Sequence, residues 1–344
     1  MWTGFLLAFA AQAPCPEARV ERQLAAMGTA LAVEVEGAER ALALRASEAA
    51  VRAIEAAEER LSTWNETSEL ARLNRAPLGA WQPLSVELEA DLAAARALAL
   101  ETGGAFDPGL GALVAAWGLR TGGRQPGSEE LAAALAEGGI AAFEFAPGRA
   151  RRLRTLAAIE EGGFGKGLAL DQAGAAARAA GATGFLLDLG GQVLVHGARP
   201  RELLLADPRE RARPVLALTL QAGSLATSGN GERGITVAGE RRGHLLDPRS
   251  GAPAPDFGSL SVLAPDATRA DGLSTGLYVQ GPEAALRHAA RYPELAVIVL
   301  QSDARGLHAR LSPSLRGRVR ALDPSLALVF EPLSSASTPD SSSR

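Results

Sequence analysis

The chain has 344 residues, of which 47% are hydrophobic and 22% are charged, a composition typical of a soluble globular protein with a large core. Its 35 Lys and Arg residues against 39 Asp and Glu residues give a net charge of −4, and the basic residues do not cluster. This charge pattern argues against nucleic acid as a partner. The single cysteine, Cys15, excludes an intrachain disulfide and a cysteine-rich metal site.

The N-terminus carries an apolar run, MWTGFLLAFAAQAPCPE, that fits the core of a secretory signal with cleavage after Ala10 or Ala13. The run is too short to cross a bilayer as a mature helix, which needs about 20 residues. Cys15 leaves a lipidated form open, beside export without a lipid or a misassigned start codon. We therefore expect residues 1–21 to be an export segment and the protein to be periplasmic or on the outer face of the inner membrane. Membrane association is expected only if Cys15 is lipidated.

Periodicity and turn residues predict a chain of mixed strands and helices. Apolar residues alternate over 31–35, which predicts a strand, and they recur at helical spacing over 45–62. Thr67 or Ser68 can cap a short helix that ends near Asn74. Further helices are expected at 86–101, 128–137, 168–180, 270–279 and 282–291, with strands on both sides of the Gly190-Gly191 turn and at 202–206, 215–220, 259–264, 295–300 and 325–331.

The order of these elements predicts the fold class. Strands and helices follow one another without a regular βαβ repeat, so we expect an α+β fold. No internal repeat is evident. The low-complexity residues 334–344, SSASTPDSSSR, predict a disordered tail.

Two glycine-rich segments carry polar residues that fit a ligand site. In GGAFDPGLG, Asp107 follows the scarce aromatic Phe106; either its carboxylate closes an Asp-Pro turn, or it receives a polar ligand group beside an apolar wall. In EEGGFGKG, backbone N–H groups at a helix start and Lys166 could hold a phosphate, or the segment is a plain connection. The second segment is neither a Walker A loop nor a dinucleotide fingerprint.

A polar stretch in the second half of the chain gathers hydroxyls, a histidine and aspartates. Asp271 and Thr275 are four residues apart, so in a helix both oxygens project from one face, as in Mg²⁺ sites with few protein ligands; alternatively, Asp271 caps its own helix. His244, three residues before Asp247, is either a general base near neutral pH or a core histidine. Residues 227–229 offer hydroxyls at a turn, but no G-x-S-x-G motif supports a serine hydrolase.

Each of these signals is weak alone, but their order resembles that of the flavin transferase (ApbE) family, whose members take FAD apart and attach FMN to a protein. The resemblance covers residues 27–279, most of the chain. The matching segments are MGT at 27–29, LSTWNETSELARLN at 61–74, GGAFDPGLGALVAAWG at 103–118, GGFGKGLALD at 162–171, LLDLGG at 186–191, TSGNGERG at 227–234, HLLDPRSG at 244–251 and ADGLSTGLYVQGP at 270–282.

The resemblance implies roles for individual residues. Trp64 stands where an aromatic side chain stacks on a flat ring. Asp271 and Thr275, with the carbonyl of Gly163, match the ligands of a divalent metal, Mg²⁺. His244 matches the proposed general base, and Asp247 would orient it or shape the turn. The residues that match FAD-contacting positions are Met27, Trp64, Ala105, Phe106, Asp107, Glu160, Lys166 and Leu245.

The family's reaction implies a two-lobed catalytic unit over residues 22–333 with FAD as substrate. Mg²⁺ would polarise the FAD pyrophosphate, and a Thr or Ser hydroxyl in a flavinylation motif of an acceptor protein would attack the FMN-side phosphorus and release AMP. A redox-complex subunit is one candidate acceptor. The alternatives are Mg²⁺-dependent hydrolysis of FAD to FMN and AMP, and an exported flavin carrier without turnover. The presence of His244 argues against a carrier, which needs no base.

Overall fold

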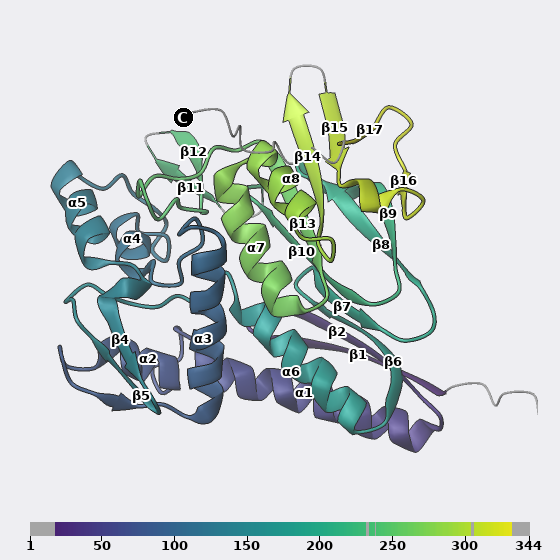
Figure 1. The fold of residues 1–344 in the computed structure, drawn as a ribbon, viewed down its shortest axis with the longest axis horizontal. Helices are drawn as coiled ribbons and strands as arrows, with labels where there is room; N and C mark the ends of the chain where they lie inside the picture. The colour runs from purple at the N-terminus through teal and green to yellow at the C-terminus, as the bar shows by residue number, and fades with distance from the viewer. Residues whose placement is uncertain (1–17, 232–233, 238, 304–305, 332–344) are drawn as a thin grey trace, which may run out of the picture.

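The computed structural model describes residues 18–231, 234–237, 239–303 and 306–331, and its largest element is a nine-stranded sheet (Figure 1). Neighbouring strands run antiparallel, except that β15 and β17 are parallel. In spatial order the strands are β1 (Ala18–Ala26), β2 (Thr29–Gly37), β6 (Ala182–Leu189), β7 (Gln192–His196), β10 (Gly223–Gly229), β13 (Gly258–Ala264), β14 (Ala296–Asp303), β15 (Gly306–Leu311) and β17 (Ala327–Phe330).

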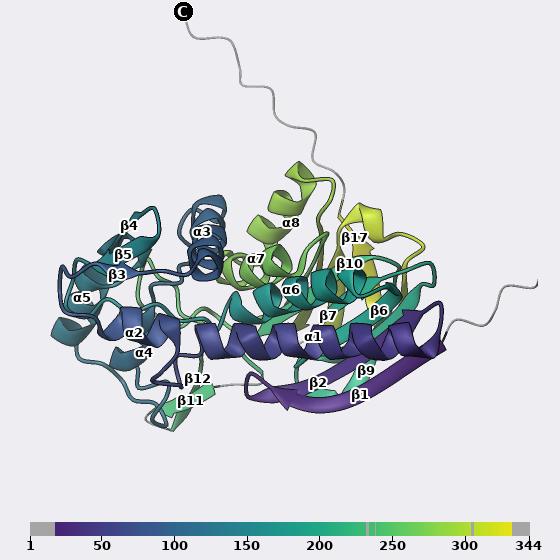
Figure 2. The same cartoon turned by 90° about the horizontal axis from the view of Figure 1, so that it is seen from below.

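Helices cover one face of this sheet (Figures 1 and 2). The alternation in β6 directs Phe185 and Leu187 into the core beneath α1 and α6, where both are fully buried. Small side chains such as Ala50 and Ala173 line that core, so the two helices lie close together. The helices of the molecule are α1 (Arg40–Leu61), α2 (Glu69–Arg75), α3 (Val86–Glu101), α4 (Gly111–Ala116), α5 (Ser128–Glu137), α6 (Gly165–Ala179), α7 (Ala267–Gln280) and α8 (Pro282–Arg291).

A three-stranded sheet covers the opposite face. Its order is β16 (Val319–Ala321), β9 (Glu210–Leu220) and β8 (Arg201–Asp207), so β8 forms an edge. Leu203 and Leu205 of β8 pack in one buried cluster with Val193 and Val195 of β7. The main sheet is therefore apolar on both faces, which explains why its central strands read as nearly continuous hydrophobic runs.

A smaller lobe lies at one end of the molecule, to the left in both cartoons. It contains α2, α4 and α5 with a sheet of β3 (Gln82–Pro83), β5 (Arg149–Arg152) and β4 (Phe143–Ala146), while β11 (Gly234–Val237) and β12 (Glu240–Gly243) form a separate hairpin. One hydrophobic cluster runs from Leu70 and Leu92 in this region to Leu273 in α7 and Val297 in β14. The two lobes therefore share a core.

The α+β prediction is confirmed, and the helices predicted at 86–101, 128–137 and 282–291 match α3, α5 and α8 at both ends. Ser68 caps α2 by accepting a hydrogen bond from the Ala71 N–H. The prediction of a turn at 227–229 is wrong, because these residues belong to β10 and pair with β13.

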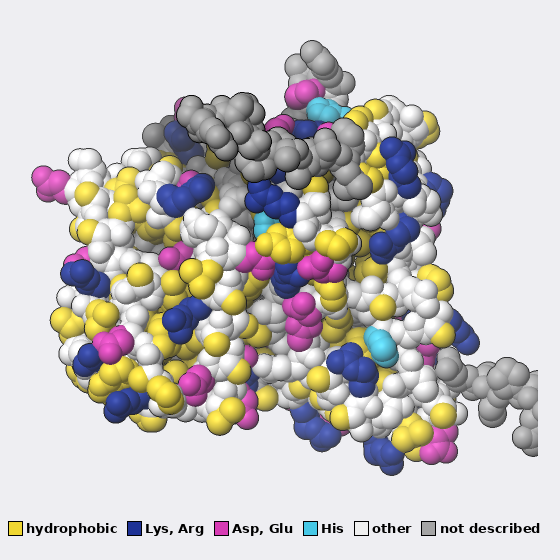
Figure 3. All heavy atoms as spheres, in the orientation of Figure 1, with side chains coloured by type: hydrophobic (Ala, Val, Ile, Leu, Met, Phe, Trp, Pro, Cys, Tyr) yellow, Lys and Arg dark blue, Asp and Glu magenta, His cyan; other side chains and the backbone are white. Residues whose placement is uncertain are grey.

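The predicted export segment, Cys15 and the tail at 334–344 lie almost wholly outside the described residues. The last part of the segment, residues 18–21, lies in β1 and pairs with β2, so the boundary expected after residue 21 falls within a strand. Among the described residues, no helix is long and apolar enough to cross a membrane. On the face shown in Figure 3, Lys and Arg side chains are scattered among acidic and apolar ones and form no stripe.

Gly167 lets α6 and α7 approach each other closely. A Cβ atom at this position would lie 2.4 Å from the Ala267 carbonyl oxygen and 2.7 Å from the Thr268 Cα, and both are backbone atoms that cannot rotate away. Gly127, at the start of α5, has no atom within 4 Å of such a Cβ and a φ of −69° that any residue adopts.

We expect Gly167→Ala to lower the free energy of unfolding by about 1–3 kcal/mol, because the added methyl group forces the two helices apart. Gly127→Ala serves as the matched control and should change it by less than about 0.5 kcal/mol. Urea unfolding followed by circular dichroism measures both. Equal midpoints for the two variants would contradict the close helix contact.

Candidate active site

A cavity of about 1270 Å³ opens where the main sheet, β8 and the first turn of α6 meet. Its wall includes backbone and side chains from elements that are far apart in the sequence. Strands of the main sheet and of the β8–β9 sheet, the helices α1, α6 and α7 and several loops contribute to it. The predicted site residues that line it are Met27, Trp64, Lys166, His244, Leu245, Asp271 and Thr275.

Asp271 lies at the junction of α6 and α7 and is 5% exposed. Its Oδ2 accepts a hydrogen bond of 3.0 Å from the Gly167 N–H, and its Oδ1 lies 3.5 Å from the Lys166 Nζ. The alternative that Asp271 caps its own helix is wrong, because Asp266 is the N-cap and accepts a bond from the Arg269 N–H. Asp271 is therefore a buried carboxylate with one oxygen directed to a lysine.

Thr275 lies one helical turn after Asp271, and its hydroxyl donates to the Asp271 carbonyl over 3.3 Å. Ser228 of β10 joins this group, 2.9 Å from the Ser274 hydroxyl and 3.5 Å from that of Thr275. A Cβ on Gly163 would lie 3.3 Å from the Thr275 Oγ1, so the Gly163 backbone borders the same hydroxyl. The three residues implied as metal ligands therefore come together.

This donor set fits Mg²⁺. It offers one carboxylate, one hydroxyl and one carbonyl, all oxygens, and Mg²⁺ commonly takes few protein ligands beside water and phosphate. Among the described residues, no group of three His, Cys, Asp or Glu side chains could hold a metal ion. That excludes only a site built from several such side chains within this part of the chain.

Asp171 of α6 fixes the start of α7. Its carboxylate accepts bonds of 2.8 Å from the N–H groups of Ala267 and Thr268, and one of 2.6 Å from the Thr268 hydroxyl. Burial raises the pKa of Asp171, and these three hydrogen bonds oppose that rise. Since α7 carries Asp271 and Thr275, this tie sets their position relative to the loop before α6.

Trp64 forms the outer wall of the cavity and is 71% exposed. The Arg120 guanidinium stacks 4.5 Å from the centre of its ring. Arg120 also pairs with Glu160 and donates to the Thr63 carbonyl over 3.2 Å. Burial raises the pKa of Glu160, while the charge of Arg120 opposes this. One face of the Trp64 indole ring is thus covered by the Arg120 guanidinium, which is itself held by Glu160 and the Thr63 carbonyl.

Met27 enters the cavity from the turn between β1 and β2. Its φ is 49°, and it is the one described residue other than glycine with a positive φ. With Gly28 at 70° it forms the kind of tight turn that suits a twisted hairpin. The Met27 N–H donates to the Glu58 Oε2 over 2.8 Å, which holds this strained backbone against α1.

Several predicted residues lie behind the cavity wall. Ala105 and Phe106 are 1% and 4% exposed, and the Phe106 ring meets Phe164 edge-on at 6.4 Å. Phe106 therefore supports the Gly163 turn from inside the core and does not form the ligand-facing wall that the sequence suggested. The Asp107 Oδ1 accepts bonds from the N–H groups of Gly109 and Ile140, as in the turn interpretation, and burial raises its pKa.

His244 and Leu245 follow the β11–β12 hairpin and reach the cavity half-buried. The Leu245 N–H donates to the Asn230 Oδ1 over 3.3 Å, which ties this segment to the end of β10. Asp247 shapes the next turn: its carboxylate accepts bonds from the Arg249 backbone and side chain. Burial raises the pKa of Asp247, but the hydrogen bonds and the charge of Arg249 outweigh burial, so this pKa is lowered. These bonds support the turn-shaping role of Asp247.

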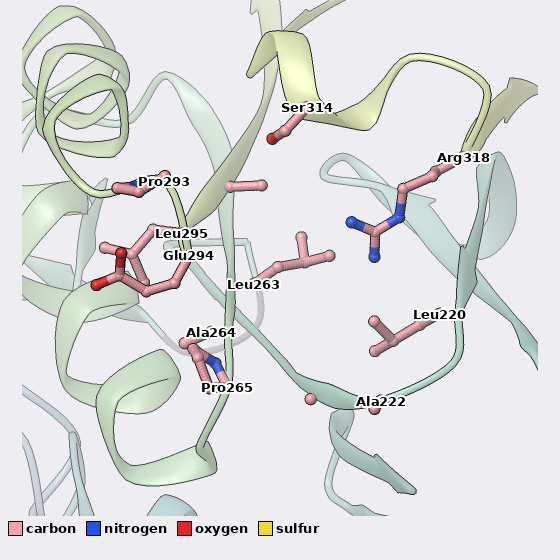
Figure 4. Close-up of a pocket in the computed structure, with 12 residues that line it drawn as sticks. Leu220, Ala222, Leu263, Ala264, Pro265, Pro293, Glu294, Leu295, Ser314 and Arg318 are labelled. Carbon is pink, nitrogen blue, oxygen red and sulfur yellow. The ribbon is translucent and has the colours of Figure 1, made fainter. Parts of the chain in front are cut away.

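A second, smaller cavity of about 330 Å³ contains none of the predicted site residues. Leu220, Leu263 and Leu295 line it, and Arg318 and Glu294 are its charged groups (Figure 4). Glu294 is already paired with Arg269 at 2.7 Å. The larger cavity is therefore the better candidate for a reaction site.

Sequence reasoning did not find Arg120 or the role of Asp171. Arg120 is one of many dispersed arginines, and only the fold brings it to Trp64. Asp171 is the last residue of the segment GGFGKGLALD, and its position five residues after Lys166 is the one sequence signal that could have identified it as part of the site. The wall formed by β8 was also missed, because its apolar residues read as ordinary strand.

The fold and the site define an α+β protein with one large cavity between the main sheet, β8 and the first turn of α6. Solved structures share this fold: an ApbE protein from Thermotoga maritima is 29% identical with a TM-score of 0.79, covering 88% of this chain and all of that one. The apo flavinyl transferase ApbE of Pseudomonas stutzeri is 23% identical with a TM-score of 0.76, covering 88% of this chain and 97% of that one.

The family model described as the ApbE family matches residues 27–299, and the chain belongs to this family. Curated relatives are named FAD:protein FMN transferase. The one from Rhodobacter capsulatus is 34% identical over 74% of this chain, and the chain spans 50% of that relative's length. The one from Klebsiella pneumoniae is 29% identical over 84% of this chain and 86% of its own length.

We expect Asp171→Ala to lower the free energy of unfolding by about 2–3 kcal/mol, because two buried N–H groups lose their acceptor. The exposed cap variant Asp266→Ala should cost only about 1 kcal/mol. Urea unfolding measures the difference, and hydrogen exchange should show earlier loss of protection in α7 for Asp171→Ala. Equal losses in the two variants would show that α6 does not fix α7.

Proposed function

We propose that the protein is a Mg²⁺-dependent FAD:protein FMN transferase, which attaches FMN through a phosphoester bond to a Thr or Ser of an acceptor protein and releases AMP. One observation carries this proposal: a single cavity gathers Lys166, His244, Asp271 and Thr275 beside the exposed ring of Trp64. Family membership supports the same reaction. We also propose that the reaction takes place outside the cytoplasm, which rests on the N-terminal apolar run alone.

The cavity suits a ligand that is flat at one end and charged in the middle. Trp64 offers a ring face for stacking, and Met27 adds a polarisable apolar contact nearby. Lys166 brings a positive charge to the first turn of α6, and the positive end of the helix dipole there also favours phosphate. The isoalloxazine would thus lie at Trp64 and the pyrophosphate near Lys166.

Asp271, Thr275 and the Gly163 carbonyl would hold the metal. When bound, Mg²⁺ supplies Lewis acidity to the pyrophosphate oxygens. Asp271 contributes the one full negative charge of this set, and its second oxygen stays on the Gly167 N–H. The helix junction therefore orients the carboxylate before any ligand enters.

The chain's own residues account for the remaining requirements of the transfer. His244 accepts the proton of the acceptor hydroxyl, whose oxygen bonds to the FMN-side phosphorus. The bond between that phosphorus and the bridging oxygen breaks, and the oxygen leaves with AMP. Lys166 offsets the negative charge that gathers on the phosphates. A redox-complex subunit bearing a flavinylation motif is the acceptor we propose.

The function is tested by incubating the purified protein with FAD and Mg²⁺, with and without synthetic peptides that each contain one threonine. Mass spectrometry should show an FMN-sized increase on a peptide together with AMP. Free FMN and AMP with every peptide unmodified would favour FAD hydrolysis. Intact bound FAD without either product would indicate a carrier and contradict the proposal.

We expect Asp271→Asn to lower turnover by about 100-fold or more, because the metal site loses its only carboxylate while the Asn oxygen can still accept from Gly167. Asp266→Asn lies on the same helix and preserves a good N-cap, so it should keep near wild-type turnover. The rate of AMP release at several Mg²⁺ concentrations measures both. Full activity in Asp271→Asn would rule out this metal site.

We expect Arg120→Met to weaken FAD binding about fivefold, because Trp64 loses the cation that supports its ring. Arg149→Met is the matched control, since Arg149 stacks on Trp81 at the same 4.5 Å and neither lines the cavity. Fluorescence titration with FAD gives both dissociation constants. If both variants bind FAD like the wild type, Arg120 does not position Trp64.

A further inference from the structure

Strand β8 presents its edge to the cavity. Residues 202–208 all line it consecutively, although Leu203 and Leu205 point into the core and Leu204, between them, is 58% exposed. A strand that turns one face to a cavity lines it with every second residue, because side chains alternate between faces. Consecutive lining therefore means that the backbone edge borders the space.

This edge has no strand partner within the described part of the chain. β8 ends the order β16-β9-β8, so its only ladder is the one with β9. On the free side, alternate N–H and C=O groups lack a backbone partner, and such an edge is a ready template for an added strand. The main-sheet strands that line the cavity, such as β7 and β10, have a paired neighbour on both sides.

The edge leads toward the reacting groups. A Cβ on Gly231 would lie 2.5 Å from the Pro208 carbonyl, and one on Gly258 would lie 3.3 Å from the Pro208 Cγ, so the end of β8 abuts the ends of β10 and β13. The same cavity continues to His244 and Thr275. A segment laid along β8 therefore runs into the proposed site.

Charge does not dominate this edge. Glu202 is paired with Arg320 at 3.0 Å, and Asp207 with Arg213 at 3.4 Å. Leu204, which lies between Glu202 and Asp207 in the strand, is an exposed apolar side chain. An occupant would accordingly be held through its backbone and through apolar contact with Leu204.

We propose that the acceptor polypeptide docks as an extended strand along the free edge of β8, which places its Thr or Ser hydroxyl at His244. This rests on the proposed function, which requires a polypeptide to enter the cavity that holds FAD. Recognition through backbone hydrogen bonds requires only a few specific side chains, so acceptors of differing sequence can share one site.

The test begins with the wild-type enzyme and the best substrate from a library of unstructured peptides that each contain one threonine. That peptide is then resynthesised with a single N-methyl group at each position in turn. We expect KM to rise about tenfold at every second residue near the threonine, because each such group removes one bond to β8. The intervening positions should change little.

An effect without this alternation, or none, would overturn edge docking while FMN transfer itself still proceeds. Cleavage of FAD with no peptide modified, or no cleavage of FAD at all, would instead refute the proposed function, and the docking that rests on it would fall with it.

A pair of enzyme variants provides an independent check. Leu204→Lys should raise the peptide KM about fivefold, because it places a charge in the apolar contact. Leu78→Lys is the matched control, since Leu78 is 57% exposed and lies outside the cavity lining. Equal KM values for the two variants would contradict a contact at Leu204.

Discussion

The close contact between α6 and α7 is the constraint on which the site depends. Gly167 lets the two backbones meet, and its N–H holds the Asp271 carboxylate at 3.0 Å. Asp171 then caps α7 from the same helix. Because these bonds bind α7 to the segment that follows the glycine-rich loop, Asp271, Thr275, Gly163 and Lys166 are placed by one rigid joint. A shift at that joint would move all of them together.

The parts of the site that residue spacing alone predicted are those that lie on regular elements. Asp271 and Thr275 share a helix face because four residues make about one turn, and no tertiary information is needed to expect it. The same holds for Lys166 at a helix start after a glycine run. Helical periodicity and the turn residues that bound each segment also predicted α3, α5 and α8 with correct ends.

What the sequence could not predict depends on long-range packing. Whether Phe106 faces a ligand or the core is decided by Phe164, which lies far along the chain. The contact of Arg120 with Trp64 joins two loops, and no local pattern marks it. Residues 227–229 read as a turn because Thr, Ser and Gly favour turns, but pairing with β13 overrides that preference. Strand register and sheet order also depend on non-local contacts, so the sequence could not predict that β8 forms a free edge.

The site also shows how a buried carboxylate can be kept ready for a cation. Asp271 is 5% exposed, and a lone buried charge would be costly. The Gly167 N–H donates a hydrogen bond to one carboxylate oxygen. The Lys166 ammonium lies 3.5 Å from the other oxygen, close enough for electrostatic attraction but too far for a short hydrogen bond. Lys166 is itself about a third exposed and can turn toward solvent or a phosphate. The oxygen near Lys166 is therefore balanced by a charge without a tight bond, and under the proposed function it is the Asp271 oxygen that would hold the metal when Lys166 pairs with the phosphates.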